Sequence, residues 1–342
     1  MSTVFVGMSG GVDSSVAAAI LKKQGHNVKG ITLKLLEQDG SMVLDAKAVC
    51  DFLEIEHFVL DLREYFAKNV MDYFCNEYFC AKTPNPCIKC NKHIKFGAML
   101  DFALENGGEY IATGHYANIG YENGSYVIKT AGFLPKDQSY VLYTLSQRQL
   151  SHCMFPLGDC SKDETRHIAR EIGLPVAEKK DSQDICFIPN GDYVAFIKER
   201  INPKPTPGFF VDTNGKKLGE HTGIWQYTCG QRKGLGGFGC AMYVKKICPQ
   251  SNNVTICEKG GEFSRKCIVT DVNLMAAQGV CGKAQVKIRY GAKPAECVVS
   301  LLEDGDVCVE FEQPQRAVTP GQAAVFYNRQ VLLGGGTIDS AQ

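Results

Sequence analysis

The residues best suited to chemistry lie at the start of the chain. A β-branched run over residues 3–6 leads into a stretch with three glycines, residues 7–11, and then into a helical pattern that begins at Ser14. Glycines let a backbone approach a ligand closely, and the N–H groups at a helix N-terminus attract anions. Serine hydroxyls add donors, and Asp13 supplies the carboxylate oxygen that Mg²⁺ prefers. The segment therefore predicts a phosphate-binding loop rather than an ordinary strand-to-helix turn.

This loop differs from two common nucleotide-binding fingerprints. No lysine follows the second glycine, as a Walker A motif requires, and the glycine spacing is not that of a dinucleotide-binding loop. The string SGGVDSS, residues 9–15, instead resembles the loop of the ATP pyrophosphatases. That resemblance implies cleavage of ATP between its α- and β-phosphates and transfer of AMP to an oxygen of a substrate. It leaves the substrate open.

Two cysteine segments narrow the choice of substrate. Residues 83–91, TPNPCIKCN, are extended by their prolines and run into a helical pattern from Lys92. Cys90 is expected near that helix N-terminus, where the helix dipole and neighbouring lysines would favour a thiolate. The second segment, residues 179–189, surrounds Cys186 with charged and amide side chains. Two separated thiols beside an ATP site suit the transfer of sulfur.

A structural zinc site is the alternative interpretation of the first segment. Cys75 and Cys80 could complete such a site, but the chain has a single Cys-x-x-Cys pair. Sixteen cysteines in 342 residues, with no secretory leader in the sequence, favour a reducing cytosol over a disulfide framework. No apolar run approaches the ~20 residues that span a bilayer. We therefore expect a cytoplasmic protein without a membrane partner.

The elements that must position these residues change in character along the chain. Short β-branched runs alternate with helical patterns over the first 200 residues, which is typical of a parallel sheet covered by helices. A proline-rich stretch, residues 202–208, predicts a linker, and short strands with glycine turns follow it. We expect a doubly wound parallel-sheet α/β domain over residues 1–203. A small central β-rich domain over residues 204–260 and a C-terminal β-barrel over residues 261–342 should follow.

The formal charge of the chain cancels, with 37 Lys and Arg against 37 Asp and Glu. A polyanionic partner must therefore be bound by local basic patches rather than by the net charge. Residues 81–96 form one candidate patch, since they contain four lysines and no acidic residue.

Longer strings, taken in chain order, resemble the tRNA-specific 2-thiouridylases, the MnmA/TrmU family. The matching strings are GMSGGVDSSV, TPNPCIKCNKHIKF, ATGHYA, KDQSYVLYTLSQRQL, FPLGD, DSQDICFIPNGDY, YTCGQRKGLG and TPGQAAVFY. The resemblance implies that ATP, with Mg²⁺, adenylates the C2 oxygen of the wobble uridine, position 34, in the tRNAs for Lys, Glu and Gln. Sulfur then displaces AMP to give 2-thiouridine. Implied partners are the anticodon stem-loop of the tRNA and a cysteine desulfurase or sulfur-relay protein.

The resemblance also implies roles for individual positions. Cys186 would carry a persulfide whose terminal sulfur attacks C2, and Cys90 would take the proximal sulfur, leaving a Cys90–Cys186 disulfide to be reduced. The ATP-contacting positions would be Gly7, Met8, Ser9, Gly10, Gly11, Val12, Asp13, Ser14, Leu33 and Gly114. The positions that meet the target base would be Asn85, Pro86 and Cys87. The positions that touch tRNA would be His115, Lys136, Asp137, Gln138, Arg289, Tyr290 and Gln322.

Cys87 departs from the family pattern, because many relatives have Asp there. The change removes an acid–base group and places a third thiol beside those of Cys90 and Cys186. Three cysteine ligands could hold a [4Fe–4S] cluster whose open iron carries the sulfur, so the persulfide relay and the cluster stay open as alternatives. The loop after Leu33 is also short. Two other functions use fewer of these features: a small-molecule amidating ligase with the same ATP loop, and a tRNA-binding module without catalysis.

Overall fold

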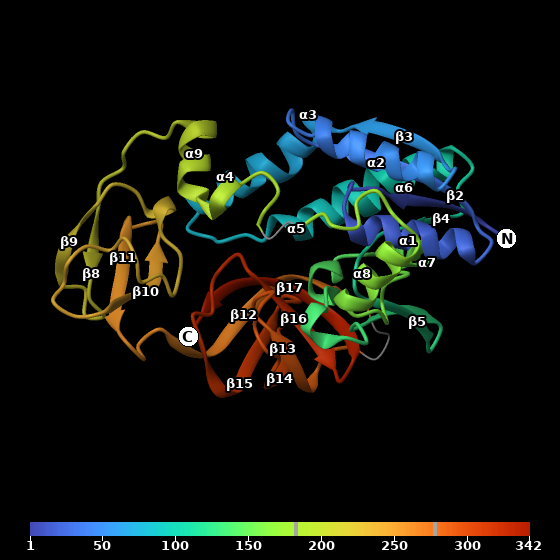
Figure 1. Ribbon diagram of the computed structural model, residues 1–342. Helices are drawn as coiled ribbons and strands as arrows, with labels where there is room; N and C mark the ends of the chain where they lie inside the picture. The colour runs from blue at the N-terminus through green and yellow to red at the C-terminus, as the bar shows by residue number, and fades with distance from the viewer. Residues whose placement is uncertain (181–183, 276–278) are drawn as a thin grey trace.

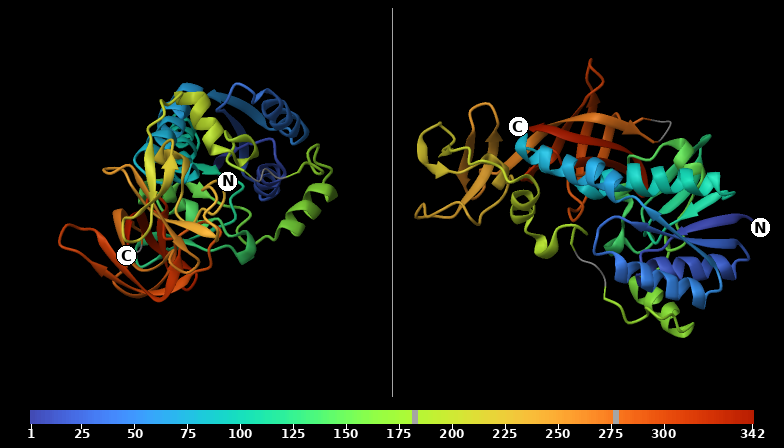
Figure 2. Two further views of the ribbon diagram at one scale, coloured as in Figure 1. Left: turned by 90° about the vertical axis from the view of Figure 1, so that its left-hand side faces the viewer. Right: turned by 90° about the horizontal axis from the view of Figure 1, so that it is seen from above.

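The computed structural model describes residues 1–180, 184–275 and 279–342. It has three parts: a helix-covered parallel sheet, a small four-stranded sheet and a β-barrel (Figure 1). Figure 2 shows the small sheet, in yellow, at one end of the molecule and the N-terminal sheet, in blue, at the other. No helix within the described ranges is long and apolar enough to cross a membrane.

The N-terminal sheet has five parallel strands in the order β3-β2-β1-β4-β7. They are β1 (Thr3–Gly7), β2 (Asn27–Lys34), β3 (Glu56–Asp61), β4 (Tyr110–Ala112) and β7 (Cys153–Met154). In the central strand, Phe5 packs on one face of the sheet and Val4 and Val6 pack on the other, and all three are fully buried. Both faces are therefore covered, which confirms the doubly wound prediction.

Helices from different parts of the chain cover these two faces. The first face carries α6 (Met99–Glu105), while the second carries α1 (Val12–Lys23), α2 (Gly40–Phe52) and α8 (Lys162–Glu171). The helix after the phosphate loop thus begins at Val12, two residues before the predicted Ser14. Gly11 is its N-cap residue.

Two long helical segments contain π-helical stretches. One joins α3 (Arg63–Phe66), η1 (Ala67–Asp72) and α4 (Tyr73–Phe79). The other joins α5 (Pro86–Lys89), η2 (Cys90–Ala98) and α6. Sequence analysis predicted that the second helix starts at Lys92, and this was wrong by six residues. Asn85 caps the helix through a bond from the Cys87 N–H to its Oδ1 (3.1 Å), and a proline at the first helical position has no N–H to leave unpaired.

The small sheet follows the short helix α9 (Tyr193–Ile201), which ends at Asn202 in the left-handed conformation (φ 48°). Its strands are β8 (Gly208–Val211), β9 (Lys217–His221), β10 (Met242–Cys248) and β11 (Asn253–Glu258), in the order β10-β11-β8-β9.

The C-terminal barrel has six strands and closes through the pairing of its first and last strands. They are β12 (Phe263–Leu274), β13 (Gly282–Lys287), β14 (Ala295–Leu301), β15 (Val307–Arg316), β16 (Ala323–Asn328) and β17 (Val331–Ala341). An additional hairpin, β5 (Asn118–Glu122) and β6 (Ser125–Lys129), leaves the first domain and pairs with β17 at the barrel. No local pattern in the sequence predicts this link between the two parts.

Candidate active site

The phosphate loop lies at the carboxyl ends of β1 and β4, where the strand order of the parallel sheet reverses. Such a switch point is the usual ligand-binding position in open α/β sheets. Gly10 has φ +62°, and a Cβ there would lie 2.6 Å from the Met42 carbonyl oxygen, so glycine is required. A Cβ on Gly114 would lie 2.9 Å from the Ser14 N atom, which shows how closely the β4 end approaches the loop.

The serine hydroxyls of the loop are engaged within the loop itself. Ser14 Oγ accepts a hydrogen bond from the Ser9 N–H (3.1 Å), and Ser15 Oγ donates to the Gly11 carbonyl (2.8 Å). These bonds fix the loop shape. The N-cap residue Gly11 has no side chain, which leaves the first N–H groups of α1 without side-chain caps. The N-terminus of α1 therefore retains the N–H donors that a phosphate would need.

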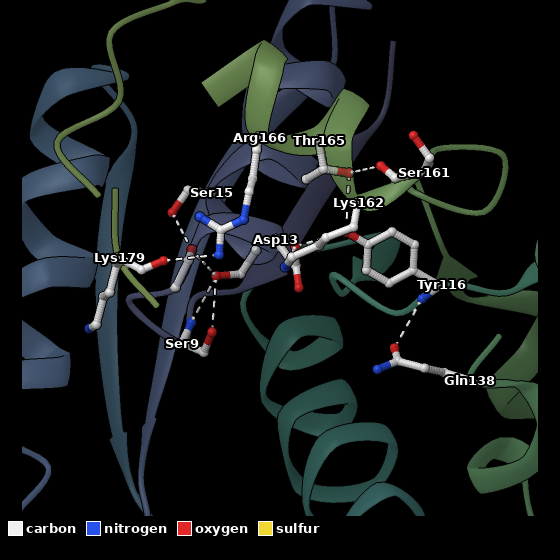
Figure 3. A network of polar contacts seen from close by, with 12 residues as sticks. Ser9, Asp13, Ser15, Tyr116, Gln138, Ser161, Lys162, Thr165, Arg166 and Lys179 are labelled. Carbon is white, nitrogen blue, oxygen red and sulfur yellow. Dashed lines mark hydrogen bonds and ion pairs between the residues drawn. The ribbon is translucent and has the colours of Figure 1, made fainter. Parts of the chain in front are cut away.

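Asp13, the predicted magnesium ligand, is held by two side chains from distant parts of the chain. Its Oδ1 accepts from the hydroxyl of Tyr116 (2.8 Å) and from Nζ of Lys162 (2.7 Å). Figure 3 shows Lys162, Thr165 and Arg166 of α8 pointing toward the loop that carries Ser9 and Asp13. Mg²⁺ is commonly held by one or two carboxylates together with substrate phosphates, so one carboxylate beside a phosphate loop fits this ion.

Lys179 touches the same loop from its outer side. Its Nζ donates to the Gly10 carbonyl (2.9 Å) and pairs with Asp45 (2.5 Å). Lys179 begins the second cysteine segment, so that segment is attached to the phosphate loop. Residues 181–183 of its motif lie outside the described residues.

The predicted thiols occupy two converging segments. Cys87 is exposed in the first turn of α5, whereas Cys90 is buried at the start of η2. Cys186 is also exposed, and the next residue, Phe187, packs edge-on against Phe74 (5.6 Å between ring centroids). Cys90 and Phe187 belong to one hydrophobic cluster, which brings the second segment against the first. All three cysteines are free thiols.

Burial sets the pKa values of these thiols. It raises the pKa of Cys90 to about 11, with a smaller lowering by Lys95. For Cys186, the surrounding protein atoms raise the pKa to about 12, and the charges of Cys90 and Cys87 add to the rise. Desolvation by neighbouring protein atoms likewise raises the pKa of Cys87, although its side chain reaches the surface. The expectation of a thiolate-favouring helix N-terminus at Cys90 was therefore wrong: the helix starts four residues earlier, and desolvation dominates.

Lys95 is a residue of this site that sequence analysis missed. It lies in η2, and its charge lowers the pKa of Cys87, Cys90 and Cys186 against the larger effect of burial. The sequence showed Lys95 only as one of several lysines in a basic stretch. Because the helix starts six residues earlier than predicted, Cys87, Cys90 and Lys95 belong to one helical segment.

The described residues do not form the predicted iron–sulfur ligand set. Across residues 1–180, 184–275 and 279–342, no group of three or more His, Cys, Asp or Glu side chains could hold a metal ion. The three thiols are close enough for their charges to interact, but their arrangement does not fit a cluster.

Several of the predicted tRNA-contacting side chains are occupied within the protein. His115 is buried, contacts Thr113 Oγ1 (2.7 Å), and burial puts its pKa well below 6.5. Asp137 is also buried and accepts from the main-chain N–H of Ala131 (3.1 Å) and the Ser139 hydroxyl (2.8 Å). Gln138 Oε1 accepts from the Tyr116 N–H (3.0 Å).

The other predicted tRNA-contacting residues, three of the barrel and Lys136 of the first domain, divide into two kinds. Nη2 of Arg289 donates to the carbonyls of Cys229 (3.2 Å) and Ala317 (2.7 Å), so its guanidinium joins the small sheet's domain to the barrel. Gln322 is bonded to the Thr83 carbonyl (2.8 Å). Tyr290 is 44% exposed and Lys136 is exposed, so these two side chains are open to a partner.

Comparison with known proteins covers nearly the whole chain. Three family models match, described as a tRNA methyl transferase HUP domain (residues 2–190), a tRNA methyl transferase PRC-barrel domain (194–258) and an aminomethyltransferase beta-barrel domain (264–338). A tRNA-specific 2-thiouridylase MnmA of Clostridium kluyveri is 46% identical over 98% of this chain and 99% of its own length. MnmA proteins of Lachnoclostridium phytofermentans and Acetivibrio thermocellus are 45% and 46% identical, covering 99% and 98% of this chain and 99% and 98% of their own lengths.

Proposed function

This chain belongs to the tRNA-specific 2-thiouridylase (MnmA) family, and we infer from this membership that it is a tRNA-uridine 2-sulfurtransferase that uses ATP. The observation that supports this best is the approach of two thiol segments to one another in a domain that also carries an ATP pyrophosphatase loop. The family-model descriptions mention methyl transfer, but a methyltransferase needs neither an ATP loop nor paired thiols.

The adenylation step is proposed for the loop at residues 7–14, with Leu33 and Gly114 beside it. The C2 oxygen of the wobble uridine attacks the α-phosphorus of ATP, and the bond between the α-phosphorus and the bridging oxygen breaks to release pyrophosphate. The uncapped N–H groups of α1 would bind the phosphates, and Asp13 would hold Mg²⁺, which neutralises phosphate charge when bound.

The sulfur step is proposed for Cys186 and Cys90. A donor, a cysteine desulfurase or relay protein, would leave a persulfide on Cys186. Its terminal sulfur attacks C2 and expels AMP; Cys90 then attacks the Cys186 Sγ and releases the 2-thiocarbonyl. The Cys90–Cys186 disulfide that forms holds two electrons fewer than the starting thiols, so an external thiol must reduce it.

Asn85, Pro86 and Cys87 are proposed to meet the target base. These residues form the start of α5, five residues or fewer from Cys90 in the chain, and Cys87 is exposed there. A base held at this helix start would lie next to both thiol segments. The proposed tRNA contacts outside it are those whose side chains are open, Lys136 and Tyr290, while Arg289, Asp137, His115, Gln138 and Gln322 would act after breaking or sharing internal bonds.

In vitro thiolation tests the proposal. The purified protein, ATP, Mg²⁺, a persulfide donor and a transcript of the tRNA for Lys, Glu or Gln should give 2-thiouridine at position 34, with one AMP for each sulfur transferred. Mass spectrometry of the digested tRNA detects the product. Absence of 2-thiouridine while the tRNA binds, or thiolation without AMP release, would contradict it.

Iron analysis separates the proposed persulfide relay from the cluster alternative. Anaerobically purified protein that is colourless and free of iron, yet thiolates tRNA from a persulfide donor, supports the relay through Cys186. Protein that holds iron and inorganic sulfide and loses both after Cys87→Ser supports the cluster instead, although the described residues do not fit it.

A further inference from the structure

Lys162 lies against the phosphate loop but belongs to none of the ATP-contacting positions inferred above. We propose that Lys162 is a ligand of the β- and γ-phosphates of ATP, and that Asp13 holds it in position until the nucleotide arrives. This inference rests on the ATP-dependent function proposed above and assigns one more residue to the same site.

The position of Lys162 is defined by contacts on both sides. Its Nζ lies 2.7 Å from Asp13 Oδ1, and its side chain is 12% exposed. The Tyr116 hydroxyl, which lies on the same carboxylate oxygen (2.8 Å), is also 3.1 Å from Thr165 Oγ1 on the next turn of α8. A lysine held this way has already lost most of its rotamer freedom, so moving its charge to a nearby phosphate costs little further entropy.

α8 reaches the loop through its side chains, and Lys162 is the one whose ammonium group lies on Asp13. Ser161 and Glu164 form a capping box, with the Glu164 N–H donating to Ser161 Oγ (3.2 Å) and the Ser161 N–H donating to Glu164 Oε2 (2.6 Å). Two of the four main-chain donors at the start of α8, the N–H groups of Ser161 and Glu164, are therefore occupied. A phosphate that lies near Asp13 would therefore meet the ammonium group of Lys162.

The charge balance of the loop explains why a lysine is needed there. Asp13 places a negative charge in the first turn of α1, where it would repel the polyphosphate of ATP. Lys162 neutralises this charge in the nucleotide-free protein. When Mg²⁺ takes over that role at Asp13, the ammonium group would turn from this carboxylate to the phosphate oxygens.

Lys179, the other lysine at the loop, is less suited to this role. Its ammonium is bonded to the Gly10 carbonyl and to Asp45, on the outer side of the loop, and its side chain is 41% exposed. It is better placed to hold the loop backbone. Lys162 is the more enclosed of the two and lies on the residue proposed to bind Mg²⁺.

Nucleotide affinities test the proposal without any tRNA or turnover. Dissociation constants for ATP, pyrophosphate and AMP are measured by calorimetry in Mg²⁺ on the full chain and on Lys162→Met, Lys162→Arg and Lys29→Met. Lys29 is a matched control, a paired lysine of the same domain (2.9 Å to Glu56) whose side chain is 24% exposed. Lys162→Met should weaken ATP and pyrophosphate about tenfold to a hundredfold, as expected for a lost charged contact, and AMP less than threefold. Lys162→Arg should recover most of the loss, and Lys29→Met should leave all three affinities unchanged.

The outcomes distinguish a failure of the Lys162 proposal from a failure of the ATP site. Equal weakening of ATP and AMP in Lys162→Met would show that the lysine only supports the loop, and unchanged affinities would show that it does not touch phosphate; both overturn the proposal. Failure of the unaltered protein to bind ATP or pyrophosphate at all would instead overturn the ATP site itself.

Discussion

Gln322 of the barrel donates a hydrogen bond from Nε2 to the main-chain carbonyl of Thr83 (2.8 Å), two residues before the Asn85 cap of α5. The Thr83 N–H in turn donates to the Pro320 carbonyl (2.8 Å). A Cβ on Gly321 would lie 2.6 Å from the Thr83 N atom, so the turn at residues 320–322 packs directly on this strand of chain. The barrel thus holds the entry to the helix that carries Cys87 and Cys90.

The first prediction concerns this contact. Gln322→Ala should slow single-turnover thiolation by about fivefold, the effect of one lost neutral hydrogen bond, because the start of α5 becomes less well fixed. The dissociation constant for ATP should stay the same. Gln330→Ala, an exposed glutamine on the turn between β16 and β17, is the control. If Gln322 acts only as a tRNA contact, the affinity for tRNA will fall while the rate at saturating tRNA stays unchanged.

The second prediction ranks the three thiols. Cys90→Ser and Cys186→Ser should each abolish turnover, since the relay needs both sulfurs, whereas Cys87→Ser should retain activity within about tenfold because Cys87 is exposed and is not needed for the relay. Quantification of 2-thiouridine over several turnovers measures this. Cys281→Ser, at an exposed cysteine of the barrel, should be neutral. Complete loss in Cys87→Ser would contradict the persulfide relay in its simple form.

The fold was largely predictable from the sequence because its signals are local. The β-branched run in β1 and the alternation of apolar and polar residues in β13 are visible in the sequence. They indicate a parallel sheet in the first part of the chain and antiparallel strands in the last. The start of α5 was also readable, since an Asn followed by Pro is a common helix-start signal, although the prediction placed it later.

The site was less predictable because its partners are far apart in sequence. Asp13 and Lys162 form an ion pair although 149 residues separate them in the chain. The sequence around either residue does not predict this pairing. Asp137 illustrates the same limit. Its setting beside Lys136 and Gln138 looks like a polar surface, but the barrel covers it and Lys287 lies 3.8 Å from its carboxylate. Packing of elements that are distant in sequence also raises the pKa of Cys90, whereas the sequence predicted a lowered pKa.

The third prediction concerns the junction of the barrel with the small sheet. Arg289→Met should lower the free energy of unfolding by about 2 kcal/mol, because a charged donor is removed and the carbonyls of Cys229 and Ala317 lose their partner. Urea titration of the tRNA-free protein measures the change. Arg265→Met, at an exposed arginine of β12, should leave stability nearly unchanged. Unchanged stability of Arg289→Met together with weaker tRNA binding would assign Arg289 to tRNA alone.

The fourth prediction uses the raised pKa values of the thiols. With the pKa of Cys186 near 12, its thiolate fraction at pH 7 is very small and should rise about tenfold for each pH unit up to that pKa. The alkylation rate of Cys186 by iodoacetamide should therefore increase about tenfold per unit between pH 7 and 10, the range below the pKa. Lys95 lowers that pKa, so Lys95→Met should slow alkylation at every pH in this range. Peptide mass spectrometry resolves Cys186 from the other cysteines, with exposed Cys240 as an internal reference whose rate should not respond to Lys95→Met. A Cys186 rate that is already independent of pH at 7 would show that its thiolate is formed near neutrality, in conflict with a pKa raised by desolvation.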